Sequence, residues 1–188
     1  MYDDAVYALV GVAKKHGGYG DAVAEAMQTF MEALRPILAD EDPELVTYFR
    51  KSAHTEGSRV LYYDGSLGIV FNEVKCGSIV PLHNHGLPEV VGVYSGSILY
   101  RTYSRLDNGE VANVAKLSLR EERVMTDGDV SVLPEPPNDI HGLRALKDTT
   151  VMNIIPGALQ PVRQYYYPSE GVYIELPAGT KPADGGGW

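Results

Sequence analysis

Two hydrophobic periods divide the chain near residue 55. Before that point, apolar residues recur every three or four positions, which is the spacing of an amphipathic helix. The clearest stripe consists of Val23, Ala26, Met27, Phe30, Met31, Leu34 and Leu38. Pro36 falls inside this stripe and predicts a kink or a restart of the helix, because proline removes a backbone donor. We expect a shorter helix before it, closed by Gly17–Gly18, and a third helix that begins at Asp42–Pro43.

The rest of the chain has the period of β-strands. From Gly57 onward, alternating β-branched and aromatic residues predict short strands at 60–63, 67–71, 98–102, 111–119, 130–133, 150–155, 164–167 and 172–176. Turn-forming pairs such as Asp64–Gly65 and Asp127–Gly128 separate them. Strands at this spacing with no helices between them predict a sandwich or small barrel. We therefore expect a helical extension over 1–55, a β domain over 56–177 and a flexible Gly- and Pro-rich tail over 178–188.

Composition limits the class of protein. The chain of 188 residues carries 16 Lys and Arg against 25 Asp and Glu, a net charge of -9, which argues against nucleic acid and anionic membranes as partners. The single Cys76 excludes an intramolecular disulfide framework and a multi-cysteine zinc site. The acidic start Met1–Asp4 lacks the features of a signal peptide, so we expect a cytoplasmic protein.

Candidate metal ligands gather in two distant segments. His83 and His85 follow an apolar run, and residues two apart in a strand point to the same face. Glu89 lies beyond a Gly-Leu-Pro turn that can bring its carboxylate back to the same point. His141 follows a Pro-rich segment much later in the chain. Imidazole and carboxylate ligands suit Fe(II), Mn(II), Ni(II) or Zn(II), and the ligand types alone do not choose among these ions.

The spacing of these residues resembles the two motifs of the cupin family. The first segment reads Gly77, five residues, His83-Asn84-His85, three residues, Glu89, six residues, Gly96. The second reads Gly128, five residues, Pro134, and then His141 after a longer gap than is usual. The resemblance covers roughly residues 57–177.

This resemblance implies an all-β fold, a jelly-roll (double-stranded β-helix) barrel with a metal ion inside one mouth. It also implies that His83, His85, Glu89 and His141 are the metal ligands. The glycines of both motifs would then supply backbone angles that other residues adopt only with strain.

Among cupins, the chain is most similar to the thiol dioxygenases, the group that includes cysteine dioxygenase. The stretch Arg59-Val60-Leu61-Tyr62 lies where that group carries an arginine that binds the substrate carboxylate, so the resemblance implies this role for Arg59. Three departures stand against it: Glu89 is present although the group uses histidines only, residues 150–155 contain no Ser-x-His-x-Tyr relay, and no cysteine follows the histidine pair.

Three further residues are candidates for the substrate pocket. Tyr100 is expected to face inward because it keeps phase with Ile98. Tyr165 belongs to a tyrosine cluster that lines either a cavity or a sheet or dimer contact. Arg144, three residues after His141, either reaches the mouth of the pocket or caps a strand.

We therefore expect a non-haem Fe(II) dioxygenase for a small polar, carboxylate-bearing or thiol-bearing metabolite, with Glu89 and Arg59 as catalytic residues. Its partners would be this small molecule and O2, and a homodimer is compatible with the fold. The alternatives are an oxygen-independent isomerase, lyase or rearrangement enzyme and a non-catalytic binding protein.

Overall fold

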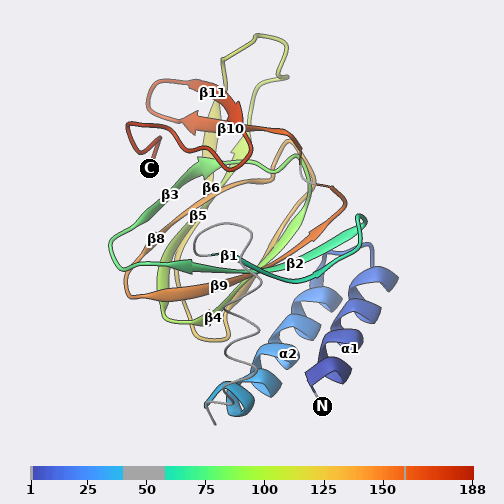
Figure 1. Ribbon diagram of the computed structural model, residues 1–188. Coiled ribbons are helices and arrows are strands. Elements are labelled where there is room, and N and C mark those ends of the chain that lie inside the picture. Colours follow the sequence, from blue (N-terminus) through green and yellow to red (C-terminus); the bar gives the residue numbers. More distant parts are fainter. Residues whose placement is uncertain (1, 40–57, 159) are drawn as a thin grey trace.

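The computed structural model describes residues 2–39, 58–158 and 160–188. In this part of the chain, two helices precede a series of strands (Figure 1). The helices are α1 (Tyr2–Lys15) and α2 (Asp21–Ala39), and neither is long and apolar enough to cross a membrane. The strands are β1 (Ser58–Tyr63), β2 (Leu67–Val74), β3 (Ile79–His83), β4 (Glu89–Ser95), β5 (Ser97–Arg105), β6 (Leu117–Thr126), β7 (Val130–Leu133), β8 (Ile140–Ala145), β9 (Thr149–Pro156), β10 (Val162–Tyr167) and β11 (Val172–Pro177). The third helix, expected from Asp42–Pro43, lies outside the described residues.

The strands form two antiparallel sheets whose pairing defines the fold. One sheet has the order β1-β2-β9-β4-β7, and the other has the order β11-β10-β3-β8-β5-β6. Strands β5 and β6 form a central hairpin, and β4 pairs with β7, β3 with β8 and β2 with β9 in successively wider turns of the chain. A long hairpin wound across two sheets in this way is a jelly roll. The predicted jelly-roll barrel with an N-terminal helical extension is therefore confirmed.

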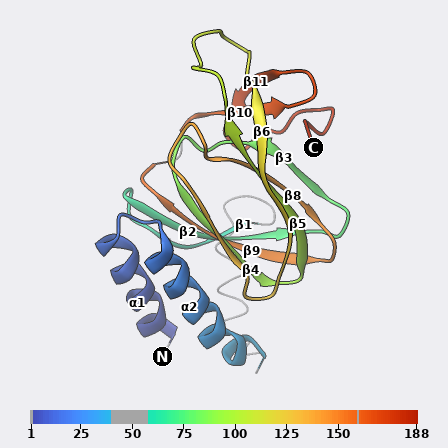
Figure 2. The same ribbon diagram turned by 180° about the vertical axis from the view of Figure 1, so that it is seen from behind.

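Both helices lie side by side on the outer face of the first sheet (Figures 1 and 2). The buried side chains of the α2 stripe are Val23, Met27, Phe30, Met31 and Leu34. They share one hydrophobic cluster with outward-facing residues of the sheet, among them Phe71 and Met152. Gly92 on β4 allows this close approach, because a Cβ atom there would lie 2.6 Å from Sδ of Met27. The helical extension is therefore part of the hydrophobic core.

Two elements differ from the sequence prediction. Helix α2 continues past Pro36, so the predicted restart does not occur, since a proline removes only one of the backbone hydrogen bonds of a long helix. A kink at Pro36 stays a prediction. The strand expected over residues 111–119 begins only at Leu117 and extends to Thr126. Residues 111–114 form a turn instead, in which Asn113 has a φ of 62° that no regular strand allows.

The motif glycines occupy the turns that the resemblance implied. Gly77, Gly96 and Gly128 have φ values of 82°, 101° and 90°. Gly96 is the most restricted, because a Cβ atom there would lie 2.5 Å from the carbonyl oxygen of Asp148. It joins β4 to β5, so this turn helps to fix the strand that begins with Glu89.

The C-terminal tail, residues 178–188, lies beside β3 and β10 (Figures 1 and 2). The hydroxyl of Tyr165 donates a hydrogen bond to the carbonyl of Thr180, and the backbone N–H of Leu82 donates one to the carbonyl of Gly187. The tail therefore has defined contacts with the barrel, although its composition predicts flexibility.

Candidate metal centre

Three histidines meet inside the barrel. His83, the last residue of β3, lies directly opposite His141 on β8 in the antiparallel register. His85 follows in the loop after β3, and its Nε2 atom lies 3.0 Å from Nε2 of His83. One ring nitrogen from each of the three residues lies within 4.8 Å of the others. All three side chains are buried. The distances between their ring nitrogens show that His83, His85 and His141 converge, as expected from the sequence.

The loop that carries His85 is held by hydrogen bonds to both of its flanks. The carboxylate of Asp139 accepts hydrogen bonds from the backbone N–H groups of His85 (3.2 Å) and Gly86 (2.8 Å). Asn84 pairs with Gln164 on β10 through its backbone N–H and its side-chain oxygen. His85 therefore reaches His83 through a fixed loop, and not through strand alternation as the sequence argument assumed.

Glu89, the first residue of β4, adds a carboxylate to the histidine cluster. Its side chain is fully buried, and Oε2 lies 3.5 Å from Nε2 of His85 and 3.8 Å from Nε2 of His141. Its other oxygen, Oε1, accepts a hydrogen bond from the side-chain amide of Asn153 on β9. Burial raises the pKa of the Glu89 carboxyl to about 8, because the interior disfavours the charged form.

The protonation states of the imidazoles suit metal binding. Burial lowers the pKa of His141 to about 4 and holds the pKa values of His83 and His85 well below their usual range. The rings are therefore neutral near pH 7, the form in which imidazole binds metal. Nδ1 of His83 donates to the carbonyl of Pro81, and Nδ1 of His141 to that of Asp139, so each Nε2 atom carries the lone pair with which an imidazole binds a metal. The Nε2 atom of His83 is 3.0 Å from Nε2 of His85.

The donor set fits a divalent transition metal. Oε2 of Glu89 is buried and has no hydrogen-bond partner among the described residues. A buried carboxylate oxygen without a partner is costly unless a cation or a proton satisfies it. The three histidines form a group that could hold a metal ion, and Oε2 of Glu89 lies beside two of them, His85 and His141. Imidazole nitrogens and carboxylate oxygens are ligands for first-row metals such as iron, manganese, nickel and zinc.

Two of the predicted pocket residues lie beside the histidines. Tyr165 is opposite His83 in the register of β10 and β3, and the two rings stack with centroids 5.8 Å apart. Tyr100 on β5 is fully buried, with its ring centroid 6.0 Å from that of His141. The Tyr100 hydroxyl is buried without a partner among the described residues, and burial raises its pKa well above the usual value. Substrate contact by either tyrosine remains a prediction.

Arg59 does not point into the barrel, and this prediction was wrong. It lies opposite Phe71 in the register of β1 and β2, and residues directly opposite one another share a face of the sheet. Phe71 belongs to the cluster between the sheet and the helices, so Arg59 points to the helix side. Its guanidinium forms an ion pair with Glu73 on that side.

Arg144 also lies away from the histidines, contrary to expectation. His141 and Leu143 face inward on β8, so strand alternation directs Arg144 outward, where it is exposed. Its guanidinium carbon lies 5.6 Å from the centre of the Trp188 ring in the C-terminal tail.

Arg163 is the arginine whose charge affects the site, and the sequence analysis did not identify it. It precedes Tyr165 by two positions on β10, so both side chains extend from the same face of the strand. Its positive charge adds to the effect of burial, which lowers the pKa values of His83, His85 and His141, and it partly opposes the rise that burial causes in the pKa of Glu89. Arg163 is half-buried, and no acidic partner holds its guanidinium within the part of the chain that the structure describes. In the sequence, its position two residues before Tyr165, a predicted pocket residue, was the signal that could have identified Arg163 as a residue of the site.

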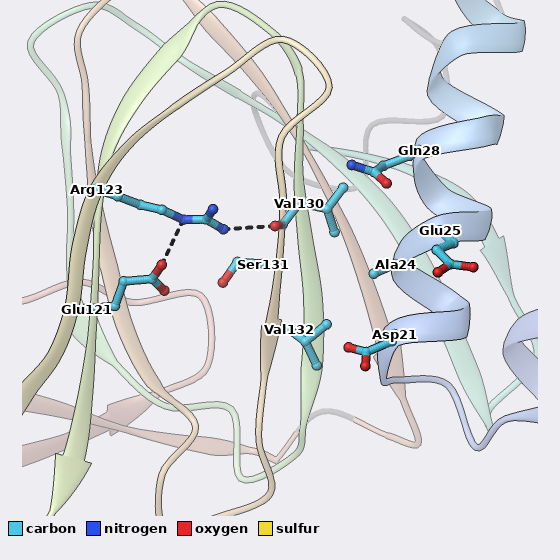
Figure 3. A pocket seen from close by; sticks show the side chains of 9 residues that line it. All are labelled: Asp21, Ala24, Glu25, Gln28, Glu121, Arg123, Val130, Ser131 and Val132. Carbon is cyan, nitrogen blue, oxygen red and sulfur yellow. Dashed lines mark hydrogen bonds and ion pairs between the residues drawn. The ribbon is translucent and has the colours of Figure 1, made fainter.

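A second concave region lies outside the barrel, between α2 and the β6–β7 edge (Figure 3). This groove of about 460 Å³ contains none of the three histidines. Arg123 at its wall is held by the carboxylate of Glu121, 3.0 Å away, and by the carbonyl of Val130, 2.8 Å away. The candidate chemistry of this protein therefore lies inside the barrel and not in this groove.

No protein-family model matches the chain, and no curated protein matches it significantly. KdgF from Halomonas sp. is 18% identical, with 56% of this chain and 85% of that chain covered and a TM-score of 0.42. A cupin superfamily protein from Desulfitobacterium hafniense is 13% identical, with 54% and 76% covered and a TM-score of 0.40. Hydroquinone 1,2-dioxygenase PnpCD is 9% identical, with 57% and 68% covered and a TM-score of 0.44. Because these similarities are weak, the fold rests on the strand order and register of the chain itself.

Proposed function

We propose that this protein is a metal-dependent enzyme of the cupin type, and that it is a non-haem iron dioxygenase for a small anionic metabolite. The observation that carries the proposal is the convergence of three buried, neutral imidazoles with the free oxygen of Glu89. His83, His85, His141 and Glu89 would hold the ion. A bound Fe(II) ion would supply electrons to O2 and leave positions at which the substrate binds.

Arg163 supports an anionic substrate. Arg163 is half-buried beside the histidines and has no acidic partner among the described residues, so its guanidinium is available to a carboxylate, which it can bind through two parallel hydrogen bonds. Tyr165 would form the adjoining wall through its contact with His83. The hydroxyl of Tyr100 would donate a hydrogen bond to a substrate oxygen, because a buried hydroxyl without a partner gains from one.

The proposal is tested by metal content and oxygen uptake. Protein purified without a metal-binding tag is analysed for iron, manganese, nickel and zinc. Iron-loaded protein is then assayed for O2 consumption with a panel of small carboxylates, half of which carry a thiol. We expect uptake that is lost in His141→Ala and reduced in Arg163→Gln, and that is unchanged in Arg59→Gln, whose guanidinium points away from the site. Protein that binds no divalent metal would refute the proposal and favour a non-catalytic binding protein.

A second candidate is an oxygen-independent isomerase or lyase, and the inner face of β9 favours it. Where thiol dioxygenases carry a histidine and a tyrosine on a late strand, β9 presents Asn153 to the site. In this second reaction class, Glu89 and the Tyr100 hydroxyl would move protons while a metal ion polarises a substrate carbonyl. Turnover of a panel compound that continues without O2 would establish this candidate in place of the dioxygenase.

A further inference from the structure

A chain of side-chain hydrogen bonds crosses the first sheet and ends on Glu89. The hydroxyl of Ser58 on β1 donates to Oδ1 of Asn72 on β2 at 2.6 Å. Nδ2 of Asn72 donates to Oδ1 of Asn153 on β9 at 2.8 Å, and Nδ2 of Asn153 donates to Oε1 of Glu89 on β4. These four strands are consecutive neighbours in the sheet. The chain therefore connects the edge strand of the barrel with the candidate metal centre.

The hydrogen bonds of this chain all have the same direction. Each donor lies on the Ser58 side and each acceptor on the Glu89 side. Hydrogen bonds aligned in one direction polarise one another, so each strengthens the next. This polarisation strengthens the last hydrogen bond of the chain, which Oε1 of the Glu89 carboxylate accepts. Its other oxygen, Oε2, remains directed at the histidines, 3.5 Å from Nε2 of His85.

The packing of the barrel does not itself require polar residues here. Val91 and Val151 lie on the same inner face of β4 and β9 and form part of an apolar cluster. Ser58, Asn72 and Asn153 are half-buried, and polar side chains that are withdrawn from water lower stability unless they are paired. A polar chain that passes beside apolar residues and ends on a site residue is therefore best explained by what it does to that residue.

We propose that Asn153, supported by Asn72 and Ser58, is a positioning residue that fixes the Glu89 carboxylate for metal binding. Asn153 donates a hydrogen bond to Oε1, and Oε2 is therefore the oxygen with which Glu89 would bind the ion. This inference rests on the proposed metal site. Partners of this kind, which bind a ligand and not the ion, change metal affinity by about 10–100-fold when removed.

Co(II) is the probe for the test, because its visible spectrum reports the number and arrangement of its ligands. We expect Asn153→Leu, which keeps the approximate size of the side chain, to bind Co(II) about 10–100-fold more weakly than wild type and to change the spectrum. Ser58→Ala, two hydrogen bonds further from Glu89, should cause a smaller loss in the same direction.

The matched control is Thr149→Val on the same strand. Thr149 is buried at the start of β9, and its hydroxyl hydrogen-bonds with Ser97 and Lys147, away from Glu89. We expect this variant to retain wild-type Co(II) affinity and spectrum, even if it unfolds at a lower temperature. Wild-type affinity and spectrum in Asn153→Leu would overturn the inference, and so would an equal loss of affinity in Thr149→Val.

Two measurements keep the test decisive. If circular dichroism shows that Asn153→Leu does not fold, Asn72→Leu interrupts the same chain one bond further out and is measured in its place. If wild type binds Co(II) in a His141-dependent manner while the chain variants match it, only the positioning role fails. If wild type binds no Co(II), the proposed function itself fails.

Discussion

His83 on β3 and His141 on β8 lie directly opposite each other in the antiparallel register, although they are far apart in sequence. Their ring centroids are 4.6 Å apart. The jelly roll creates this pairing because it winds β3 and β8 into neighbouring positions of one sheet. The next strand of that sheet, β10, places Tyr165 against His83, so three neighbouring strands build one wall of the site.

Removal of one imidazole should abolish tight metal binding. We expect wild type to take up one equivalent of Co(II) or Fe(II) in equilibrium dialysis, and His141→Ala to bind it more than about 100-fold more weakly, because loss of a ligand exceeds the loss typical of its supporting partners. The control is His16→Ala, which removes an exposed histidine after α1. Equal uptake by wild type and His141→Ala would contradict the assignment.

Glu89 should make the stability of metal-free protein depend on pH. The Glu89 carboxyl has a pKa of about 8 in the folded protein against an ordinary value of 4.5. Because the folded pKa is the higher one, its contribution to the free energy of unfolding is complete below pH 4.5 and is lost as the pH rises through 8. Glu89→Gln lacks this titration. As the pH rises from 4.5 to 8, the unfolding free energy of wild type should therefore fall relative to that of Glu89→Gln, by on the order of a few kcal/mol.

This difference is measured by urea unfolding of chelator-treated protein at several pH values. The histidines contribute with the opposite sign, because their lowered pKa values make stability fall as the pH drops below 6.5. They are present in both proteins, so comparison of Glu89→Gln with wild type isolates the carboxyl. A difference that stays constant with pH would show that Glu89 ionises equally easily in the folded and unfolded chains.

Arg163 and Arg59 should behave differently toward anions. We expect Arg163→Gln to weaken the binding of propionate to Co(II)-loaded protein by about 10–100-fold. This is the change in affinity that corresponds to the loss of one hydrogen bond to a charged group. Arg59→Gln should leave it unchanged, because its guanidinium pairs with Glu73 on the helix side. Isothermal titration calorimetry measures both. Equal effects of the two substitutions would contradict an anion-binding role for Arg163.

The packing of α2 on the barrel is tested at Met27 and Gly92. Met27→Ala should destabilise the protein by about 2–5 kcal/mol, because it leaves a cavity in the core. Gly92→Ala should cost about 1–3 kcal/mol by overpacking, since the new Cβ atom would lie 2.6 Å from Sδ of Met27. The double variant should lose less than the sum of the two. Glu32→Ala, at an exposed position of α2, serves as the control, and strictly additive effects would contradict the contact.

The spacing of residues within each motif predicted the candidate metal ligands and the turns. His83, His85 and Glu89 lie close together in sequence, so local geometry limits where their side chains go. Gly96 was predictable for a similar reason, because its positive φ is a property of one turn. The apolar stripe of α2 likewise predicted its buried face, since a helix repeats every 3.6 residues wherever it packs.

The direction of isolated polar side chains was decided only by the tertiary structure. Arg59 and Arg163 both lie on strands, and a shift of one residue in register moves a side chain to the other face. The pairing of Arg59 with Phe71 directs it toward the helices, whereas Arg163 shares the face of Tyr165. Strand register also decided that Asn153 lies beside Glu89, because β9 pairs with β4. Sequence alone therefore identified the candidate ligands of a cation, and strand register determined which other groups surround them.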